Sequence, residues 1–352
     1  MEANKHLTSF SVENFKCFET FELKSIGQFN LIAGDNNVGK TSLLEALLLE
    51  TDLAQTLHNL NSVYAFKHNL ETIESSKRNY LSYFININTN ADYEIKFQYN
   101  SAQKLRIINK DIRLHEKEVI DKSQAKYAGM NQIGEFVALY KDEILEDVSP
   151  AIYIQRKSMI IPPVIPNNMG YTSGIVKAYS RLIDQDLKNN YLLVSALRYF
   201  IPDIEDIRIL KDQFDETYIV IQEKGKSKPL PITSFGDGTL ILMRLMLRIM
   251  ISQNQRLMID EIDTGIHYSR MKDFLRTIIH TAKEHNVQLF ATTHSKECIE
   301  AYSEVIYEFD EKTQTKSRFI RLEKLSSGRI IARNYNYDQF SSTLELGNEI
   351  RS

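Results

Sequence analysis

The stretch that decides the fold is GDNNVGKTS, which runs from Gly34 to Ser42. It matches the pattern G-x-x-x-x-G-K-[S/T], and Gly39, Lys40 and Thr41 fill its last positions. The glycines let the backbone curl so that its N–H groups point at phosphate oxygens. The lysine supplies a positive charge for the β- and γ-phosphates, and the threonine supplies a hydroxyl for Mg²⁺. We expect the nucleotide to be bound by Gly34, Asn36, Asn37, Gly39, Lys40, Thr41 and Ser42.

The residues on both sides of this loop have the order that a phosphate-binding loop needs. FNLIAG, residues 29–34, is typical of a buried strand, and TSLLEALLLE, residues 41–50, is typical of a helix. The start of that helix would add its positive dipole end to the phosphate site. A chance match in a turn rich in glycine and asparagine would lack this order of strand, loop and helix.

A second motif is RLMIDEIDTGIHYS, residues 256–269. Its apolar start predicts a short strand that ends in two carboxylates, Asp260 and Glu261. Adjacent residues at a strand end point to different sides, so one can hold Mg²⁺ while the other polarises the attacking water. An isolated Asp-Glu pair is equally typical of a solvated helix start. The preceding strand and the phosphate loop favour the nucleotide site.

A third strand is predicted in VQLFATTHS, residues 287–295, and His294 stands just past its end. In an open α/β sheet, ligands lie outside the carboxyl ends of the strands. Gly34, Asp260 and His294 therefore converge if their three strands are parallel neighbours. A lone histidine is usually structural or exposed, but from this position it could hydrogen-bond the γ-phosphate or the catalytic water.

The phosphate loop, SFGDG at residues 234–238, LMIDE, DTGIH and TTHS together resemble the motifs of ABC-type ATPase heads of the SMC/RecF/OLD-like group. The opening FSVENFKCFETFEL is similar to the first strand of that group. The ending RNYNYDQFSSTLELGNEIR resembles short standalone members often encoded beside effector genes in bacterial anti-phage modules. The resemblance covers the whole chain and is specific mainly in residues 8–50 and 230–300. It implies an α/β fold, with a mixed or parallel core sheet flanked by helices, an antiparallel β lobe and a helical lobe.

The resemblance also implies a role for each motif residue. Lys40 would contact the phosphates of ATP, and Thr41 would bind Mg²⁺. Asp260 would bind the water shell of the metal, and Glu261 would be the general base. His294 would sense the γ-phosphate.

Other motif residues would act between two subunits. Asp263 would lie in the dimer-contact loop. Ser234, Gly236 and Gly238 match the signature motif, which reaches the nucleotide of the opposite subunit. The usual signature is L-S-G-G-x, and this chain departs from it by placing Phe235 where a small residue is usual.

The family also places a Mg²⁺-sensing glutamine between its lobes. Gln155 follows an apolar segment in IYIQRKS and is our candidate metal ligand. Gln124, Gln132 and Gln185 lie in the same interval, and no local pattern decides between them.

We predict a single ATPase head over residues 1–352, divided at 125 and 225. Residues 1–125 would form an N-terminal lobe, which carries the phosphate loop and antiparallel strands that turn at Asn100-Ser101. Residues 126–225 would form a helical lobe or insert, helical over 171–201 and preceded by a proline-rich connector at 149–166. Residues 226–352 would carry the signature, the acidic pair and the histidine. Two hairpins are expected, around Gly225 and over residues 317–335.

The bulk composition limits the class of protein. The net charge of −3 indicates no global basic field for nucleic acid. The two cysteines, Cys17 and Cys298, are far apart, which argues against a disulfide framework or zinc site and predicts a cytoplasmic location. The first residues lack the apolar core of a signal peptide, and no apolar run is long enough for a membrane span.

Two functions are compatible with these motifs. The first is an ATP-hydrolysing switch that closes as an ATP-sandwiched homodimer, or builds into a larger assembly. It would control an effector, such as a nuclease or toxin, in anti-phage defence. The alternative is a DNA-binding recombination or repair ATPase of the RecF/SMC type, with basic clusters at residues 75–80 and 103–113. A transporter subunit is disfavoured by the long insert, and an ATP binder without hydrolysis by the intact Glu261. Only 58 residues follow His294, too few for the nuclease domain of OLD-type proteins.

Overall fold

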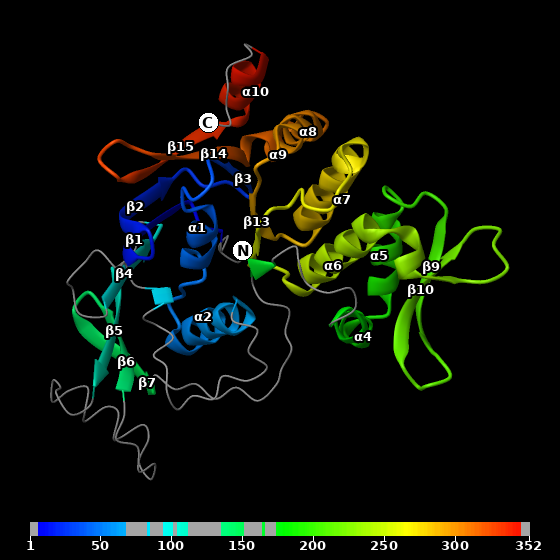
Figure 1. The fold of residues 1–352 in the computed structure, drawn as a ribbon, viewed down its shortest axis with the longest axis horizontal. Helices are drawn as coiled ribbons and strands as arrows, with labels where there is room; N and C mark the ends of the chain where they lie inside the picture. Colours follow the sequence, from blue (N-terminus) through cyan, green and yellow to red (C-terminus); the bar gives the residue numbers. More distant parts are fainter. Residues whose placement is uncertain are drawn as a thin grey trace, which may run out of the picture.

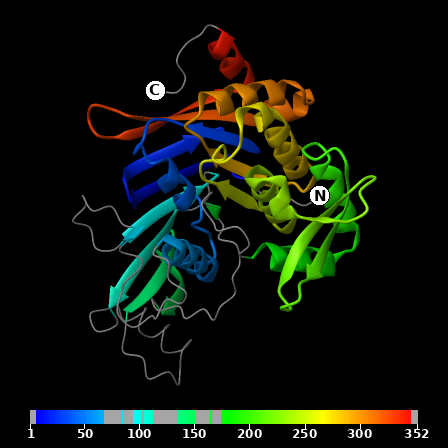
Figure 2. The same cartoon turned by 45° about the vertical axis from the view of Figure 1, so that its right-hand side comes forward.

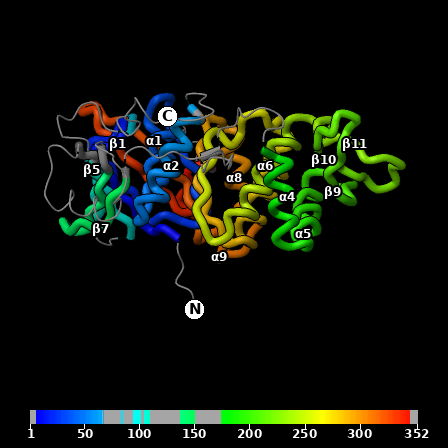
Figure 3. Tube along the Cα trace, turned by 90° about the horizontal axis from the view of Figure 1, so that it is seen from below, coloured from blue at the N-terminus to red at the C-terminus, as the bar shows by residue number. Residues whose placement is uncertain are grey.

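The computed structural model describes residues 6–67, 83–84, 94–100, 104–111, 135–150, 164–165 and 174–345. Several predictions fall outside these residues: Gln155, its rivals Gln124 and Gln132, the basic cluster at 75–80 and most of the proline-rich connector. Figure 1 shows three sheets spread along the long axis of the molecule, and the view from below in Figure 3 shows the same order.

The core sheet has six strands and is parallel apart from one edge. In spatial order its strands are β15 (Ile330–Asn336), β14 (Ser317–Lys324), β3 (Phe29–Ala33), β13 (Gln288–Thr292), β12 (Arg256–Ile259) and β8 (Val164–Ile165). The strands that lead to Gly34, His294 and Asp260 are β3, β13 and β12, which are parallel neighbours. The predicted condition for a common site at their carboxyl ends is confirmed.

Both faces of the core sheet are covered, because successive residues of a strand point to opposite sides. In β13, Leu289 and Ala291 pack with the helices of one face. Phe290, which lies between them, packs into the cluster of the N-terminal lobe on the other face. All five residues of β3 and of β13 are buried. Continuous apolar strands of this kind are expected in a parallel sheet that is buried on both sides.

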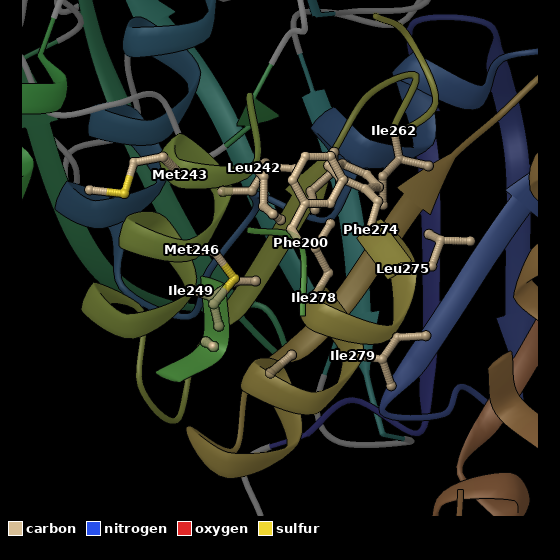
Figure 4. Close-up of a cluster of buried hydrophobic side chains, with 14 of the residues drawn as sticks. Phe200, Leu242, Met243, Met246, Ile249, Ile262, Phe274, Leu275, Ile278 and Ile279 are labelled. Carbon is tan, nitrogen blue, oxygen red and sulfur yellow. The ribbon is translucent and has the colours of Figure 1, made fainter. Parts of the chain in front are cut away.

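The helices on the first face are α6 (Asp237–Ile251), α7 (Met271–Glu284) and α8 (Lys296–Tyr307), which lie side by side in Figure 2. Leu242 and Met246 of α6 meet Phe274 and Ile278 of α7, and Phe200 closes the same cluster (Figure 4). This packing fixes α6, and therefore the signature loop before it, against the helix that follows the acidic pair. Short helices η4 (Tyr268–Arg270), α9 (Glu311–Thr315) and α10 (Tyr337–Glu345) complete this part.

The N-terminal lobe contains an antiparallel sheet of six strands. In spatial order these are β2 (Phe18–Lys24), β1 (Ser9–Phe15), β4 (Glu94–Tyr99), β5 (Leu105–Asp111), β6 (Glu135–Lys141) and β7 (Ile144–Pro150). Helices α1 (Lys40–Ala46) and α2 (Leu53–Lys67) pack in the same apolar cluster. The predicted turn at Asn100 between antiparallel strands is confirmed. Beyond the proposed lobe boundary at 125, β6 and β7 extend this sheet by hydrogen bonding to β5 and to each other.

The helical lobe contains α4 (Ile175–Gln185) and α5 (Lys188–Leu197), which confirms the prediction of helix within residues 171–201. It also contains a three-stranded antiparallel sheet of β9 (Ile204–Lys211), β10 (Thr217–Glu223) and β11 (Leu230–Pro231). The predicted hairpin around Gly225 is the β10–β11 pair. The proposed lobe boundary at 225 lies within this hairpin. The second predicted hairpin is confirmed as β14–β15.

Candidate nucleotide-binding site

The phosphate loop curls around the ammonium group of its own lysine. Lys40 begins α1, and its Nζ donates hydrogen bonds of 2.7 Å to the carbonyl oxygens of both Gly34 and Asp35. The chain reaches this shape through left-handed backbone at Asn37, with φ of 63°, and at Gly39, with φ of 96°. Lys40 is 6% exposed. The charge predicted to meet phosphate is therefore already held inside the loop.

Two loop positions are sterically restricted to glycine. A Cβ on Gly34 would lie 2.6 Å from the carbonyl oxygen of Leu322, and φ at Gly34 is 147°. A Cβ on Gly39 would lie 2.8 Å from Sγ of Cys17, beside the ring of Phe18. These neighbours come from β14 and from the turn between β1 and β2. The loop is thus shaped by contacts from both ends of the sequence, since only glycine fits where other backbone comes so close.

The site mixes one buried cation with several carboxylates. Burial lowers the pKa of Lys40, and the charges of Asp260, Asp35 and Glu261 oppose this shift. Burial likewise lowers the pKa of His294, with the positive charge of Lys40 as a second cause. The lowered pKa favours the neutral imidazole, in which one nitrogen donates a hydrogen bond and the other accepts one.

Asp260 is held by two hydroxyl groups, one from the start of α1 and one from the end of β13. Thr41 Oγ1 donates a hydrogen bond of 2.8 Å to Asp260 Oδ2. Thr292 Oγ1 donates a hydrogen bond of 2.6 Å to Asp260 Oδ1. Both oxygens of the carboxylate are thereby oriented, and the predicted convergence of the phosphate loop with the acidic pair is observed.

Glu261 differs from its neighbour in both exposure and backbone conformation. It is exposed, and its φ of 52° lies in the left-handed region. Its backbone N–H donates a hydrogen bond of 2.8 Å to Thr292 Oγ1. A non-glycine residue in this conformation costs about 1–3 kcal/mol and needs support from its surroundings. The two carboxylates therefore occupy different environments, as the sequence predicted for a metal ligand and a general base.

Asp263 and His294 are linked through the residue between the histidine and β13. Thr293 Oγ1 donates a hydrogen bond of 2.6 Å to Asp263 Oδ1, and the Ser295 N–H donates to Thr293 Oγ1 at 3.0 Å. The loop after β12 is thus tied to the end of β13 at the acidic pair and again at Asp263.

The signature residues lie apart from this group of side chains. Ser234 is in the short helix η3 (Ile232–Phe235), which packs against α6, β10 and β11, whereas α1 packs against β1 and β13. Ser234 and Gly236 are exposed. Helix α6 begins at Asp237, with Gly236 as its N-cap at φ of 82° and no side-chain cap. The structure does not bring Ser234 to the phosphate loop of its own chain.

Phe235 does not cover the exposed signature residues. Its side chain is half-buried and packs against the core cluster of helices. It lines a cavity of 380 Å³ together with Phe200, Gly238 and Ile266. Phe235, which replaces the usual small residue, therefore lies at the edge of this cavity. The cavity is located between α6 and the loop after the acidic pair.

The donor set suits Mg²⁺ better than a transition metal. Among the residues that the structure describes, no three His, Cys, Asp or Glu side chains form a metal cluster. The Thr41 hydroxyl and the Asp260 carboxylate instead place two oxygen ligands side by side. Mg²⁺ is usually bound by one or two such protein oxygens, with substrate phosphates and water completing its shell.

Sequence reasoning missed the two threonines that hold the carboxylates. Thr292 and Thr293 were present in the TTHS motif, but only its histidine was given a role. Their signal is a pair of hydroxyl side chains at the end of a buried strand next to the acidic pair. The contact of Cys17 with the loop was missed as well, since no pattern connects residues so distant in the sequence.

Comparison with known proteins gives a family and a fold. Residues 29–300 match the protein family described as "AAA domain, putative AbiEii toxin, Type IV TA system". The chain is 26% identical over 345 residues to the "ATP/GTP phosphatase" of Helicobacter pylori (strain ATCC 700392 / 26695), covering 88% of this chain and 91% of that protein. It is 26% identical over 169 residues to "Uncharacterized protein MJECL44" of Methanocaldococcus jannaschii, covering 46% of this chain and 49% of that protein.

Among solved structures, the chain resembles an SMC head crystallised with the C-winged helix domain of ScpA. The TM-score is 0.52 at 11% identity, and the match covers 95% of this chain and 99% of the SMC head. This likeness confirms the predicted fold, an ABC-type ATPase head. None of the helices described in the structure has the length and apolar character needed to cross a bilayer.

Proposed function

Because the chain belongs to the family described as "AAA domain, putative AbiEii toxin, Type IV TA system", we propose that it binds and hydrolyses ATP as a conformational switch. The observation that carries this proposal is the double clamp on Asp260 by Thr41 and Thr292. The phosphate loop and the Asp260 carboxylate, our proposed metal ligand, thereby lie together at one edge of a parallel sheet, and Glu261 follows directly in the chain. The printed name of the Helicobacter pylori relative, an ATP/GTP phosphatase, supports the same chemistry.

The binding step uses residues of the phosphate loop. The Lys40 ammonium exchanges the carbonyl oxygens of Gly34 and Asp35 for phosphate oxygens, which bind it more strongly because they carry charge. Backbone N–H groups from Asn36 to Ser42 donate to the phosphates. Thr41 and Asp260 would hold Mg²⁺, which when bound would supply positive charge to neutralise the phosphates.

The hydrolysis step uses the acidic pair and the histidine. Glu261 accepts a proton from water as the water oxygen forms a bond to the γ-phosphorus. The bond between that phosphorus and the β–γ bridging oxygen breaks, and ADP leaves with the electron pair. His294, whose lowered pKa favours the neutral imidazole, donates a hydrogen bond to the γ-phosphate or orients the water. The products are ADP and inorganic phosphate.

The position of the signature loop supports the proposal that a second subunit completes the site. Ser234 and Gly236 are exposed and lie on η3 and the start of α6, which do not pack on α1 of the same chain. In a homodimer closed on two ATP molecules, these residues and Gly238 complete the site of the opposite subunit, and Asp263 lies in the contact loop. Hydrolysis reopens the dimer, and this motion is the output of the switch.

The output controls a protein effector, such as a nuclease or toxin, in anti-phage defence. This part of the proposal is supported by the resemblance of the motifs to standalone members of the group. Cys17 and Cys298 are both free, which supports a location in the reducing cytoplasm. Gln155 stays a predicted metal ligand.

The alternative function, DNA binding of the RecF/SMC type, finds little support in the described part of the basic cluster at residues 103–113. Arg106 in β5 forms ion pairs with Glu94 at 3.1 Å and with Glu143 at 2.7 Å. A guanidinium engaged by two carboxylates has less positive charge to offer to a phosphate backbone.

One experiment distinguishes the two functions. Purified protein is assayed for phosphate release from ATP, with the Glu261→Gln variant as control, in the presence and absence of duplex DNA over a range of salt concentrations. The switch function predicts hydrolysis that is lost in the variant and independent of DNA. ATP-dependent, salt-sensitive DNA binding would favour the alternative.

A further inference from the structure

Two neighbouring threonines at the end of β13 connect the histidine loop to the acidic loop. Thr292 and Thr293 are both fully buried, with 0% of each residue exposed. Each hydroxyl donates one hydrogen bond to a carboxylate after β12 and accepts one from a backbone N–H. Buried hydroxyls with both capacities used are expected where a structure fixes other groups in place.

The Thr292 hydroxyl acts on both members of the acidic pair. It donates to Asp260 Oδ1 at 2.6 Å and accepts from the Glu261 N–H at 2.8 Å. One hydroxyl therefore sets the rotation of the Asp260 carboxylate and holds the backbone of Glu261 at its φ of 52°. Loss of this hydroxyl would remove one of the two hydroxyl bonds to Asp260 and the bond to the Glu261 backbone, although neither carboxylate is itself altered.

The Thr293 hydroxyl contacts the loop after β12 further along the chain, at Asp263. It donates to Asp263 Oδ1 at 2.6 Å and accepts from the Ser295 N–H at 3.0 Å. The bond from Ser295 spans His294, so the histidine lies between Thr293, which is bonded to Asp263, and Ser295, whose N–H is bonded to Thr293.

We propose that Thr292 and Thr293 are positioning residues with separate outputs. Thr292 positions Asp260 and Glu261 for metal binding and hydrolysis. Thr293 positions Asp263 for contact with the second subunit. Together they couple occupation of the γ-phosphate site, sensed at His294, to both events. This inference rests on the proposed function, because it assigns consequences to residues of that same site.

The first test separates metal binding from nucleotide binding in Thr292 variants. The affinity for a non-hydrolysable ATP analogue is measured with Mg²⁺ and with EDTA, and kcat and KM are measured alongside. Replacement of groups that orient metal ligands typically costs about 10- to 100-fold in metal affinity or activity. We expect Thr292→Val to lose most of the Mg²⁺-dependent gain in affinity and to lower kcat, while its affinity in EDTA is unchanged. Thr292→Ser, which keeps the hydroxyl, restores both.

The second test uses the Thr293 variants. Thr293→Val is expected to keep the Mg²⁺-dependent gain in analogue affinity but to lose dimerisation with the analogue, measured as molecular mass. Thr293→Ser restores dimerisation. A general loss of folding would lower the Mg²⁺-dependent gain and dimerisation equally, and replacement by serine would restore neither. Loss of the Mg²⁺-dependent gain at position 292 and of dimerisation at position 293 therefore identifies positioning.

The matched control is Thr281→Val in α7. Thr281 is 2% exposed, and its hydroxyl donates only to the carbonyl oxygen of Thr277. The same chemical change is thus made in another buried site, and it is expected to leave both readouts unchanged.

The inference would be overturned if Thr292→Val and Thr293→Val both behaved like Thr281→Val. It would also be overturned if both valine variants lost the same one of the two measured properties. Analogue binding is measured separately from hydrolysis. A wild-type protein that binds ATP without hydrolysing it would therefore refute the proposed function. The ratio of the analogue affinities with Mg²⁺ and with EDTA would still test the role of Thr292.

Discussion

Thr41 Oγ1 donates a hydrogen bond of 2.8 Å to Asp260 Oδ2, although the two residues are 219 positions apart in the chain. The bond forms because β3, β13 and β12 are parallel neighbours, so that the loops at their carboxyl ends share one edge of the core sheet. It connects the residue predicted to bind Mg²⁺ in the phosphate loop with the residue predicted to bind it after β12.

Replacement of Lys40 by alanine is expected to weaken ATP binding by about 10- to 100-fold or more, because a hydrogen bond to a charged group contributes about 1.5–3 kcal/mol. Titration calorimetry measures this affinity. Lys24→Ala removes a lysine that is 71% exposed and serves as the control for loss of charge. Unchanged ATP affinity in Lys40→Ala would show that the nucleotide binds elsewhere.

Replacement of Glu261 by glutamine is expected to lower kcat by about 10²- to 10⁴-fold, which is the usual contribution of a general base. The amide keeps the size of the side chain and does not alter the backbone bond to Thr292, so ATP affinity should be retained. Phosphate release under saturating ATP measures the effect. A variant with wild-type turnover would assign the activation of water to another residue.

Gly34 and Gly328 provide a test of loop packing. Both have positive φ, of 147° and 86°, but a Cβ meets the Leu322 carbonyl oxygen only at Gly34 and meets nothing within 4 Å at Gly328. We expect Gly328→Ala to lower the free energy of unfolding by about 1–2 kcal/mol. Gly34→Ala should lower it by about 1–3 kcal/mol more, because of the clash. Denaturant unfolding measures both, and equal effects would contradict the packing described for the loop.

The lowered pKa of His294 predicts a contribution to the pH dependence of stability. The folded protein binds a proton at this site less readily than the unfolded chain, so protonation favours unfolding. The contribution is complete above the unfolded value of 6.5 and is lost as pH falls through the folded pKa. Wild type should therefore lose more stability than His294→Gln between pH 7.5 and about pH 5. His267→Gln, at an exposed position, controls for loss of a histidine. Parallel losses in wild type and His294→Gln would contradict the lowered pKa of this half-buried imidazole.

The strands that carry the site were predictable because each is a short, mostly apolar segment with polar side chains at or near its end. Phe29–Ala33 and Gln288–Thr292 are buried on both faces, which leaves little ambiguity about their type. The phosphate-loop glycines followed from the motif alone. The reason why Gly34 and Gly39 cannot carry a Cβ did not, because Leu322 and Cys17 are distant in sequence.

Lobe boundaries were less predictable, because strand pairing is not a local property. Residues 135–150 contain two strands whose partner is β5, and nothing in their own sequence states which sheet they join. The hydrogen bonds of the Thr292 and Thr293 hydroxyls could not be predicted for the same reason. A threonine at a strand end is ordinary, and its role appears only when the neighbouring strand places a carboxylate beside it.

The central claim is that ATP closes two subunits around sites completed by Ser234, and molecular mass in solution tests it most directly. Glu261→Gln is measured with and without ATP, alone and with the further change Ser234→Arg, which puts a bulky cation on the exposed signature loop. The account predicts a dimer of Glu261→Gln with ATP and monomers without it. The double variant should bind ATP with unchanged affinity and stay monomeric. A double variant that dimerises as fully as Glu261→Gln, or a Glu261→Gln protein that is monomeric with saturating ATP, would contradict it.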